Sequence, residues 1–129
     1  MNAIDSIAAE IVDSAFKIHK ELGPGLLESA YEICLEHELT KRGFSVERQK
    51  PQPVHYDGIV IDAGYRLDLL VNDLVIIELK AVTELALIHQ AQLTTYLKLS
   101  RKTLGLLINF NVPLIKNGIR RIANQFQES

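Results

Sequence analysis

Two neighbouring apolar runs, residues 65–71 and 74–81, contain charged side chains and so restrict the folds open to this chain. Asp68 interrupts the first run, and Glu78 and Lys80 lie near the end of the second. Residues two apart on a strand point to the same face, so Glu78 and Lys80 share a face. Carboxylates and an ammonium are costly to bury without partners. A divalent cation is the simplest partner for both acids, and this combination indicates metal-assisted phosphodiester cleavage.

The turn between these runs decides whether the two acids meet. If a two-residue turn joins the strands, Asp68 lies opposite Ile77, and Glu78 projects from the other face. A three-residue loop over residues 72–74, or a β-bulge, would instead place Asp68 opposite Glu78. The site therefore requires a backbone register that the ordinary two-residue turn would not give.

Length and composition are those of one globular domain over residues 1–129. Hydrophobic residues make up 47% of the chain and charged residues 23%, which is ordinary for a domain that buries a core. The apolar stretches are too short for a membrane span, and the N-terminus lacks a cleavage-type signal. The lone Cys34 excludes a disulfide framework and a cysteine metal site. These features favour a cytoplasmic protein with no membrane partner.

The net charge of −2 argues mildly against strong nonspecific nucleic-acid binding, which depends on neutralising phosphates. Local basic groups would offset this. They comprise Lys41, Arg42, Arg48 and Lys50, and then Lys98, Arg101, Lys102, Lys116, Arg120 and Arg121. Such groups are equally often a solvated surface, and the sequence leaves both interpretations open.

Periodicity predicts the element order ααβββββαββ. Apolar residues recur at helical spacing from Ala3 to Leu22, and Gly23-Pro24-Gly25 ends that helix. The other expected elements are a helix over 26–41, strands over 44–50, 54–56, 59–63, 65–71 and 74–81, a helix from about 83 to 99, and strands over 104–110 and 119–122. This order suits an α/β sandwich with a mixed central sheet.

The third expected helix, from about residue 83 to 99, should follow the strand over 74–81 closely. Thr83 resembles a helix N-cap, and a connection of about two to four residues is typical of such steps. Its expected sheet-facing stripe is Leu85, Ile88 or His89, Gln92, Tyr96 and Leu99.

Five motif elements together resemble the PD-(D/E)xK nuclease superfamily. The charged residues of the two apolar runs form a D-x9-E-x-K pattern, and Gln92-x3-Tyr96 is similar to the QxxxY motif of the RecB-like and lambda-exonuclease-like branch. Residues 25–31, GLLESAY, resemble the motif that names the GxxExxY family of that superfamily. The resemblance implies a restriction-endonuclease-like core and a Mg²⁺- or Mn²⁺-dependent nuclease that acts on nucleic acid, with DNA favoured.

The resemblance also implies roles for individual residues. Lys80 would orient or deprotonate the attacking water and balance charge in the transition state. Gln92 and Tyr96 would line the site and contact substrate, since residues four apart on a helix project from one face. The implied metal ligands, which complete the catalytic set with Lys80, are Asp68, Glu78, the backbone carbonyl of Leu79, and Glu28 directly or through water.

Each role has a structural alternative. Lys80 would otherwise form an ion pair with one acid, and Tyr96 would be a core residue. Glu28 would complement a helix dipole, with Glu32 one turn later as the second candidate for the helix acid. The whole chain would alternatively be a catalytically weak binding or assembly module on the same fold, because 129 residues leave little room for substrate selection. Exposed strand edges would also allow a homodimer.

Overall fold

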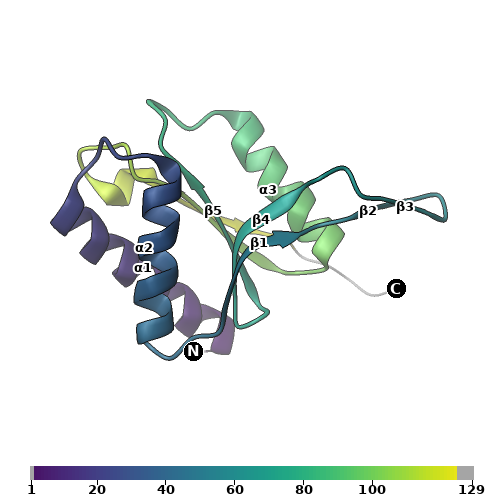
Figure 1. Cartoon of the computed structure of the whole chain (residues 1–129), viewed down its shortest axis with the longest axis horizontal. Coiled ribbons are helices and arrows are strands. Elements are labelled where there is room, and N and C mark those ends of the chain that lie inside the picture. The colour runs from purple at the N-terminus through teal and green to yellow at the C-terminus, as the bar shows by residue number, and fades with distance from the viewer. Residues whose placement is uncertain (1, 125–129) are drawn as a thin grey trace.

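The computed structural model describes residues 2–124 as a five-stranded mixed sheet flanked by helices (Figure 1). The helices are α1 (Ala3–Leu22), α2 (Glu28–Lys41), α3 (Leu87–Ser100) and the short 3-10 helix η1 (Ile115–Gly118). The strands are β1 (Val46–Pro51), β2 (Val54–Tyr56), β3 (Ile59–Ile61), β4 (Arg66–Val71), β5 (Val75–Lys80), β6 (Leu104–Asn109) and β7 (Ile119–Ala123). The sheet order is β1-β4-β5-β6-β7, with β5 and β6 parallel and the other pairs antiparallel. The expected mixed α/β architecture is confirmed.

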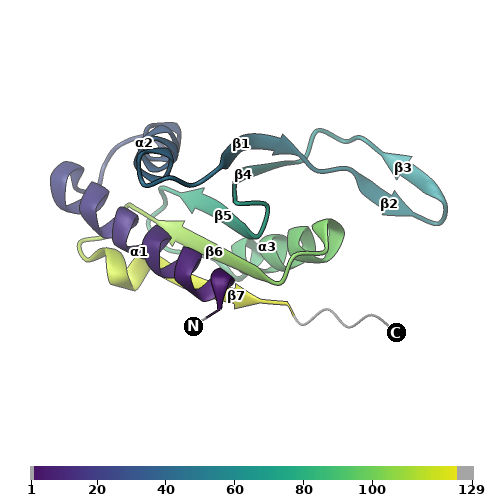
Figure 2. The same ribbon diagram turned by 90° about the horizontal axis from the view of Figure 1, so that it is seen from below.

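Helices cover both faces of the sheet (Figure 2). The larger core lies between α1, α2 and one sheet face, and includes Ile11, Leu35 and Ile77. The smaller core lies between α3 and the opposite face, and includes Ile76 and Leu93. The central position of β5 explains its apolar sequence, because a strand covered on both faces has no solvent side. None of the helices within residues 2–124 is long and apolar enough to span a bilayer.

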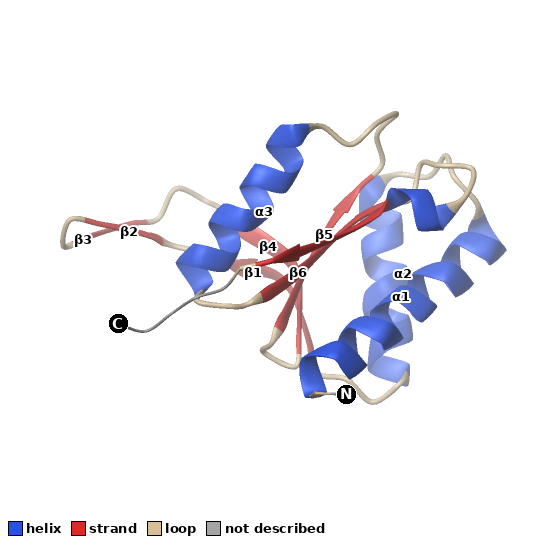
Figure 3. Ribbon diagram, turned by 180° about the vertical axis from the view of Figure 1, so that it is seen from behind, coloured by secondary structure: helices blue, strands red, loops and turns tan. Residues whose placement is uncertain are grey.

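Strands β2 and β3 form a separate hairpin that projects beyond the sheet (Figure 3). Asp57 and Gly58 join them with positive φ angles of 46° and 78°, as a two-residue hairpin turn of the Asp-Gly kind requires. The predicted hairpin is confirmed, although it pairs only with itself. Residues 59–61 of its second strand are exposed.

The start of α3 corrects one prediction. The helix begins at Leu87 and not near Thr83, so the connection after β5 covers residues 81–86. The side chain of buried Asn109 accepts a hydrogen bond from the Val82 N–H (3.1 Å) and donates one to the Val82 carbonyl (2.9 Å). These bonds hold the chain beside β6 after β5 ends, and the helix therefore starts later.

The rotation of α3 corrects a second prediction. Its buried residues are Leu93, Tyr96 and Leu97, whereas Gln92 is exposed. The Leu93 side chain packs against Gly105 of β6, where an added Cβ would lie only 2.8 Å from a Leu93 methyl group. The absence of a side chain at Gly105 lets Leu93 enter the sheet, and this contact sets the helix face.

Candidate active site

The loop between β4 and β5 has three residues, as the convergence of the two acids requires. Val71 pairs with Val75, and Leu69 pairs with Ile77. Asn72 anchors the loop to the segment before β1, because its side-chain oxygen accepts from the Ser45 N–H and its own N–H donates to the Ser45 carbonyl, both at 2.8 Å. Continuing this register brings residues 68 and 78 opposite each other.

Asp68 and Glu78 bind each other's strands through their side chains. The Asp68 N–H donates to Oε2 of Glu78 at 2.8 Å, and the Leu79 N–H donates to Oδ2 of Asp68 at 2.8 Å. Backbone pairing of β4 with β5 extends only to Leu69 and Ile77. Beyond this pair, the two carboxylates accept the hydrogen bonds of the backbone N–H groups. Both acids are thus held in place at the point where the strands separate.

The proximity of the two carboxylates has an electrostatic consequence. Glu78 is 6% exposed. Burial, and then the charge of Asp68, raise the pKa of Glu78 to about 9, and Lys80 lowers it only in part. Without a cation, Glu78 therefore holds a proton at neutral pH. A cation at this position would favour the ionised form of both acids.

Two acids of α2, Glu28 and Glu32, lie close to Asp68. Burial raises the pKa of Glu28, which Lys80 lowers and the charge of Asp68 raises further. Glu32 is buried and bound through Oε1 to Arg48 (3.2 Å) and Gln49 (2.7 Å). Glu32 is therefore engaged in side-chain contacts, whereas the charges that act on Glu28, after the larger effect of burial on its pKa, are chiefly those of Lys80 and Asp68. This arrangement favours Glu28 over Glu32 as the helix acid.

Gln49 is a site residue that strand periodicity does not reveal. Its side-chain nitrogen donates to Glu32 (2.7 Å) and to Oδ1 of Asp68 (3.3 Å), and so bridges α2 and β4. Its φ angle is 55°, a left-handed conformation that is uncommon for residues other than glycine. The polar run Glu47-Arg48-Gln49-Lys50 predicts an exposed strand face. The two partners of Gln49 become visible only in the structure.

Lys80 is half-buried at the end of β5, beside Asn109 of β6. Asn109 is 1% exposed and its side-chain oxygen also accepts from the Asn111 N–H at 3.2 Å. Through its bonds to Val82 and Asn111, Asn109 fixes the segments that follow β5 and β6, next to the position of Lys80. The sequence contains no pattern that distinguishes it from an ordinary strand-ending asparagine.

Tyr31, three residues after Glu28, makes contacts that hold the loop before α2 in place. Its ring stacks on Phe110 with centroids 4.4 Å apart. Its hydroxyl donates to the Gly23 carbonyl (2.6 Å) and accepts from the Leu26 N–H (3.1 Å). Tyr31 thus ties the loop before α2 to the helix and fixes the position at which Glu28 enters. Its role is structural.

Tyr31→Phe should therefore lower the free energy of unfolding by about 0.5–1.5 kcal/mol, because the Gly23 carbonyl and the Leu26 N–H lose their hydroxyl partner. Denaturant unfolding of both forms measures this. Tyr56→Phe on the exposed β2 is the matched control and should leave stability unchanged. Equal stability of the Tyr31 variant and the parent would contradict the structural role.

Tyr96 lies close to the acids, whereas Gln92 does not contact them. Burial, and then the charge of Glu78, raise the pKa of Tyr96. Gln92 is exposed and its side-chain nitrogen donates to the Tyr96 hydroxyl at 3.3 Å. Gln92 therefore reaches the site only through Tyr96 in the protein without substrate.

The sequence was compared with protein-family models, curated proteins and solved structures. A family model described as the PD-(D/E)XK nuclease superfamily matches residues 5–122. The chain belongs to this superfamily. No match was found among curated proteins or solved structures. The matched range includes both strands of the acidic pair, the helix acids and α3, so superfamily membership covers the whole candidate site.

PD-(D/E)XK nucleases generally use divalent metals, and the donor atoms fit such an ion in part. Asp68 and Glu78 offer carboxylate oxygens, which suit hard cations such as Mg²⁺. Over residues 2–124, however, no group of three or more His, Cys, Asp or Glu side chains is positioned to hold a metal ion. Two carboxylates leave the remaining positions to a backbone carbonyl, water and substrate phosphate, as is usual for Mg²⁺.

Many basic residues of this PD-(D/E)XK protein are engaged in ion pairs. Arg42 contacts three acids of the helical layer, and Arg48 pairs with Glu32. Further ion pairs of predicted basic residues join Lys50 to Glu47, Lys102 to Asp73, and Arg121 to Asp5. These contacts favour the structural interpretation for Arg42, and they leave Arg48 beside the acids of the site.

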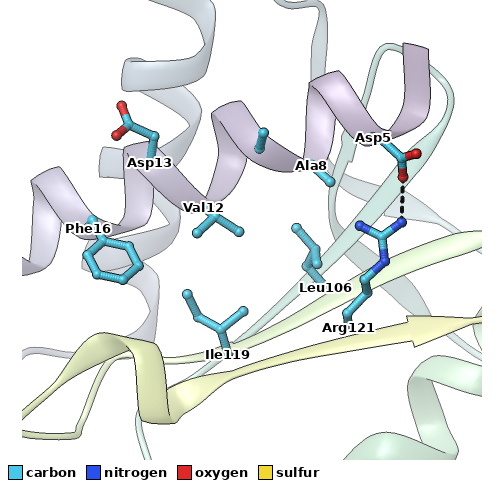
Figure 4. A pocket seen from close by; sticks show the side chains of 9 residues that line it. Asp5, Ala8, Val12, Asp13, Phe16, Leu106, Ile119 and Arg121 are labelled. Atoms are coloured by element: carbon cyan, nitrogen blue, oxygen red, sulfur yellow. Dashed lines mark hydrogen bonds and ion pairs between the residues drawn. The ribbon is translucent and has the colours of Figure 1, made fainter. Parts of the chain in front are cut away.

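A groove of about 690 Å³ lies away from the acidic pair, between α1 and β7 (Figure 4). Its walls include Val12, Phe16 and Ile119, and an ion pair between Asp5 and Arg121 lies at one end (2.6 Å). This groove is largely apolar and contains none of the predicted site residues.

Proposed function

We propose that this protein is a metal-dependent nuclease that hydrolyses phosphodiester bonds in nucleic acid, with DNA as the favoured substrate and Mg²⁺ or Mn²⁺ as the ion. The observation that carries the proposal is the reciprocal binding of Asp68 and Glu78 across β4 and β5, with Lys80 two residues further along the same strand. A pure scaffold has no physical need for a buried carboxyl group beside a second carboxylate, because burial and the neighbouring charge both disfavour its ionisation.

Asp68 and Glu78 would hold the ion, with the Leu79 carbonyl as a further oxygen ligand and Glu28 acting directly or through water. The ion would supply a nucleophilic water and polarise the phosphate. Lys80, at the end of β5, would act in one of two ways: as a neutral amine it would take the proton of the attacking water, and as an ammonium it would orient that water and balance charge on the phosphate oxygens.

The motifs around the site support assignment to a finer group. Tyr31 fixes the entry to α2 and Glu28 lies in its first turn, which gives each prominent residue of the GxxExxY pattern a physical task. Gln92 binds Tyr96 on α3, as a QxxxY pair would. We assign the protein to the GxxExxY family on these grounds, as one domain over residues 1–129 that acts in the cytoplasm.

The direct test is cleavage of labelled single- and double-stranded DNA and RNA by the purified chain, with Mg²⁺, Mn²⁺ or EDTA. Cleavage that requires the metal is the expected result. Comparison of end-labelled linear and circular substrates separates exonuclease from endonuclease action. Absence of cleavage on every substrate, by protein that binds nucleic acid, would overturn the proposal.

A catalytically weak binding or assembly module is the second candidate. The observation in its favour is that the acids of residues 2–124 form no three-ligand metal group. Such a module would bind nucleic acid or a second copy of the chain without turnover. Light scattering with the cleavage assay distinguishes these cases, because only the module predicts assembly without metal-dependent products.

Gln92→Ala is expected to reduce cleavage severalfold while leaving the melting temperature nearly unchanged, because Gln92 is exposed and its contact to Tyr96 is weak. Tyr96→Phe removes only the hydroxyl and should lower turnover if that group contacts substrate. Thr40→Ala, an exposed position on α2 outside the site, is the control. Full activity in both variants would remove Gln92 and Tyr96 from the site.

A further inference from the structure

A pocket of about 550 Å³ opens beside the candidate active site, between α3 and the segments that precede β4. One wall is the exposed face of α3, and the other is formed by Val54 at the base of the projecting hairpin and Tyr65 just before β4. The pocket is lined by Val54, Tyr65, Ile88, His89, Ala91, Gln92, Thr95, Tyr96 and Leu99.

Tyr65 and Tyr96 connect this pocket to the acids. Their rings meet edge to face, with centroids 6.3 Å apart. Tyr65 lies three residues before Asp68, and the Tyr65 carbonyl accepts from the Gln52 N–H at 2.8 Å, which fixes its backbone. Tyr96 packs against Leu67, the residue next to Asp68. Tyr65 and Tyr96 therefore place the pocket next to the start of β4, the strand that carries Asp68.

The chemistry of the lining selects the kind of group that fits. The lining residues include no Asp, Glu, Lys or Arg, so nothing there compensates a phosphate charge. The two tyrosines and the aliphatic residues offer flat apolar contacts, and Tyr65 is 46% exposed. Gln92 and His89 add hydrogen-bonding groups at the rim. Such a lining suits a flat, uncharged heterocycle with polar edges.

We propose that the pocket binds an unpaired nucleobase of the substrate strand, next to the phosphate at Asp68 and Glu78. The proposal rests on the proposed nuclease function and deepens it, since it names single-stranded nucleic acid as the substrate class. A paired base is stacked on both sides and does not present its face to a side chain, whereas an unpaired base stacks readily on aromatic residues.

Binding of fluorescein-labelled oligonucleotides tests this. The protein carries Lys80→Ala to prevent cleavage, and Mg²⁺ is present. The probes are a single strand, its duplex, and a single strand of equal length with abasic nucleotides, which keeps the phosphates and removes the bases. The parent should bind the single strand about tenfold more tightly than the abasic strand, and more tightly than the duplex.

Tyr65→Ala should weaken binding of the normal strand about tenfold and change binding of the abasic strand little. Tyr65→Phe keeps the ring and should bind as the parent does. Ala91→Leu, at an exposed helix position that lines the pocket, should obstruct the base and weaken binding in the same selective way. The matched control is Tyr56→Ala, because Tyr56 is an exposed tyrosine of the hairpin outside the pocket.

Four outcomes would each overturn the base pocket. In Tyr65→Ala, they are an equal loss of binding on the normal and abasic strands, or no loss at all. The other two are an equal loss in Tyr56→Ala and no binding of any probe. The nuclease function is judged separately by cleavage with the unaltered chain. Cleavage together with Tyr65-independent binding would refute the pocket alone. Selective, Tyr65-dependent base binding without any cleavage would refute the nuclease and retain the pocket.

Discussion

Lys80→Ala should reduce metal-dependent cleavage by at least about a hundredfold, the usual cost of losing a group that handles a proton in the transition state. Lys80 is half-buried at the end of β5, two residues after Glu78. Its ammonium is the cationic side chain that lowers the pKa of both Glu28 and Glu78. Removing it takes away the charge beside the scissile phosphate without disturbing the strand backbone.

Initial rates over a range of metal concentrations measure this effect, together with melting curves. Lys20→Ala on α1, an exposed lysine away from the site, is the matched control and should retain full activity. Lys80→Arg keeps the charge but not the proton-transfer chemistry, and should recover little activity. Near-parental rates in Lys80→Ala would assign this lysine to a structural ion pair and refute the proposed mechanism.

The metal-free protein should become less stable as the pH rises from about 5 to 9. The pKa of Glu78 is about 9 in the folded protein against an ordinary value of 4.5. Between these values the folded state retains a proton that the unfolded state has lost, so increasing pH favours unfolding. The contribution of the Glu78 proton to the free energy of unfolding is complete at pH values below the ordinary pKa of 4.5. It declines as the pH rises, until Glu78 ionises in the folded protein near pH 9.

Asp68→Asn should flatten this pH dependence, because it removes the charge that adds to the effect of burial on Glu78. The variant should also bind Mn²⁺ at least about tenfold more weakly and be as stable as the parent, or more stable, without metal. Chemical denaturation at several pH values and calorimetric titration with Mn²⁺ measure both effects. Asp62→Asn, an exposed aspartate, is the control. Unchanged metal affinity in Asp68→Asn would exclude Asp68 as a ligand.

Local sequence patterns determined most elements of this fold. The helical periodicity of residues 3–22 reproduces α1, and the Asp57-Gly58 turn predicts the β2–β3 hairpin. The two apolar runs with their charged residues predict β4 and β5 and identify the acids of the candidate site. Such features depend on residues close together in the chain, where periodicity and turn preferences are reliable.

Tertiary contacts decided how those elements meet. The three-residue loop that sets Asp68 opposite Glu78 is anchored by Asn72 on Ser45, which is 27 residues away. Gln49 joins α2 to β4 across 17 and 19 residues, and no periodicity encodes that link. Each of these contacts satisfies hydrogen-bonding groups that would otherwise lack partners where the strands separate.

Helix α3 shows the same division at the functional surface. The sequence by itself predicted a helix with both Gln92 and Tyr96 on its sheet-facing side, and this was wrong for Gln92, which is exposed. Leu93 enters the space above Gly105, and Asn109 delays the helix start by holding Val82. Packing volume and hydrogen bonds from β6 therefore placed Tyr96 beside the acids and left Gln92 exposed, because helix rotation depends on the shape of the partner surface and not on the helix sequence alone.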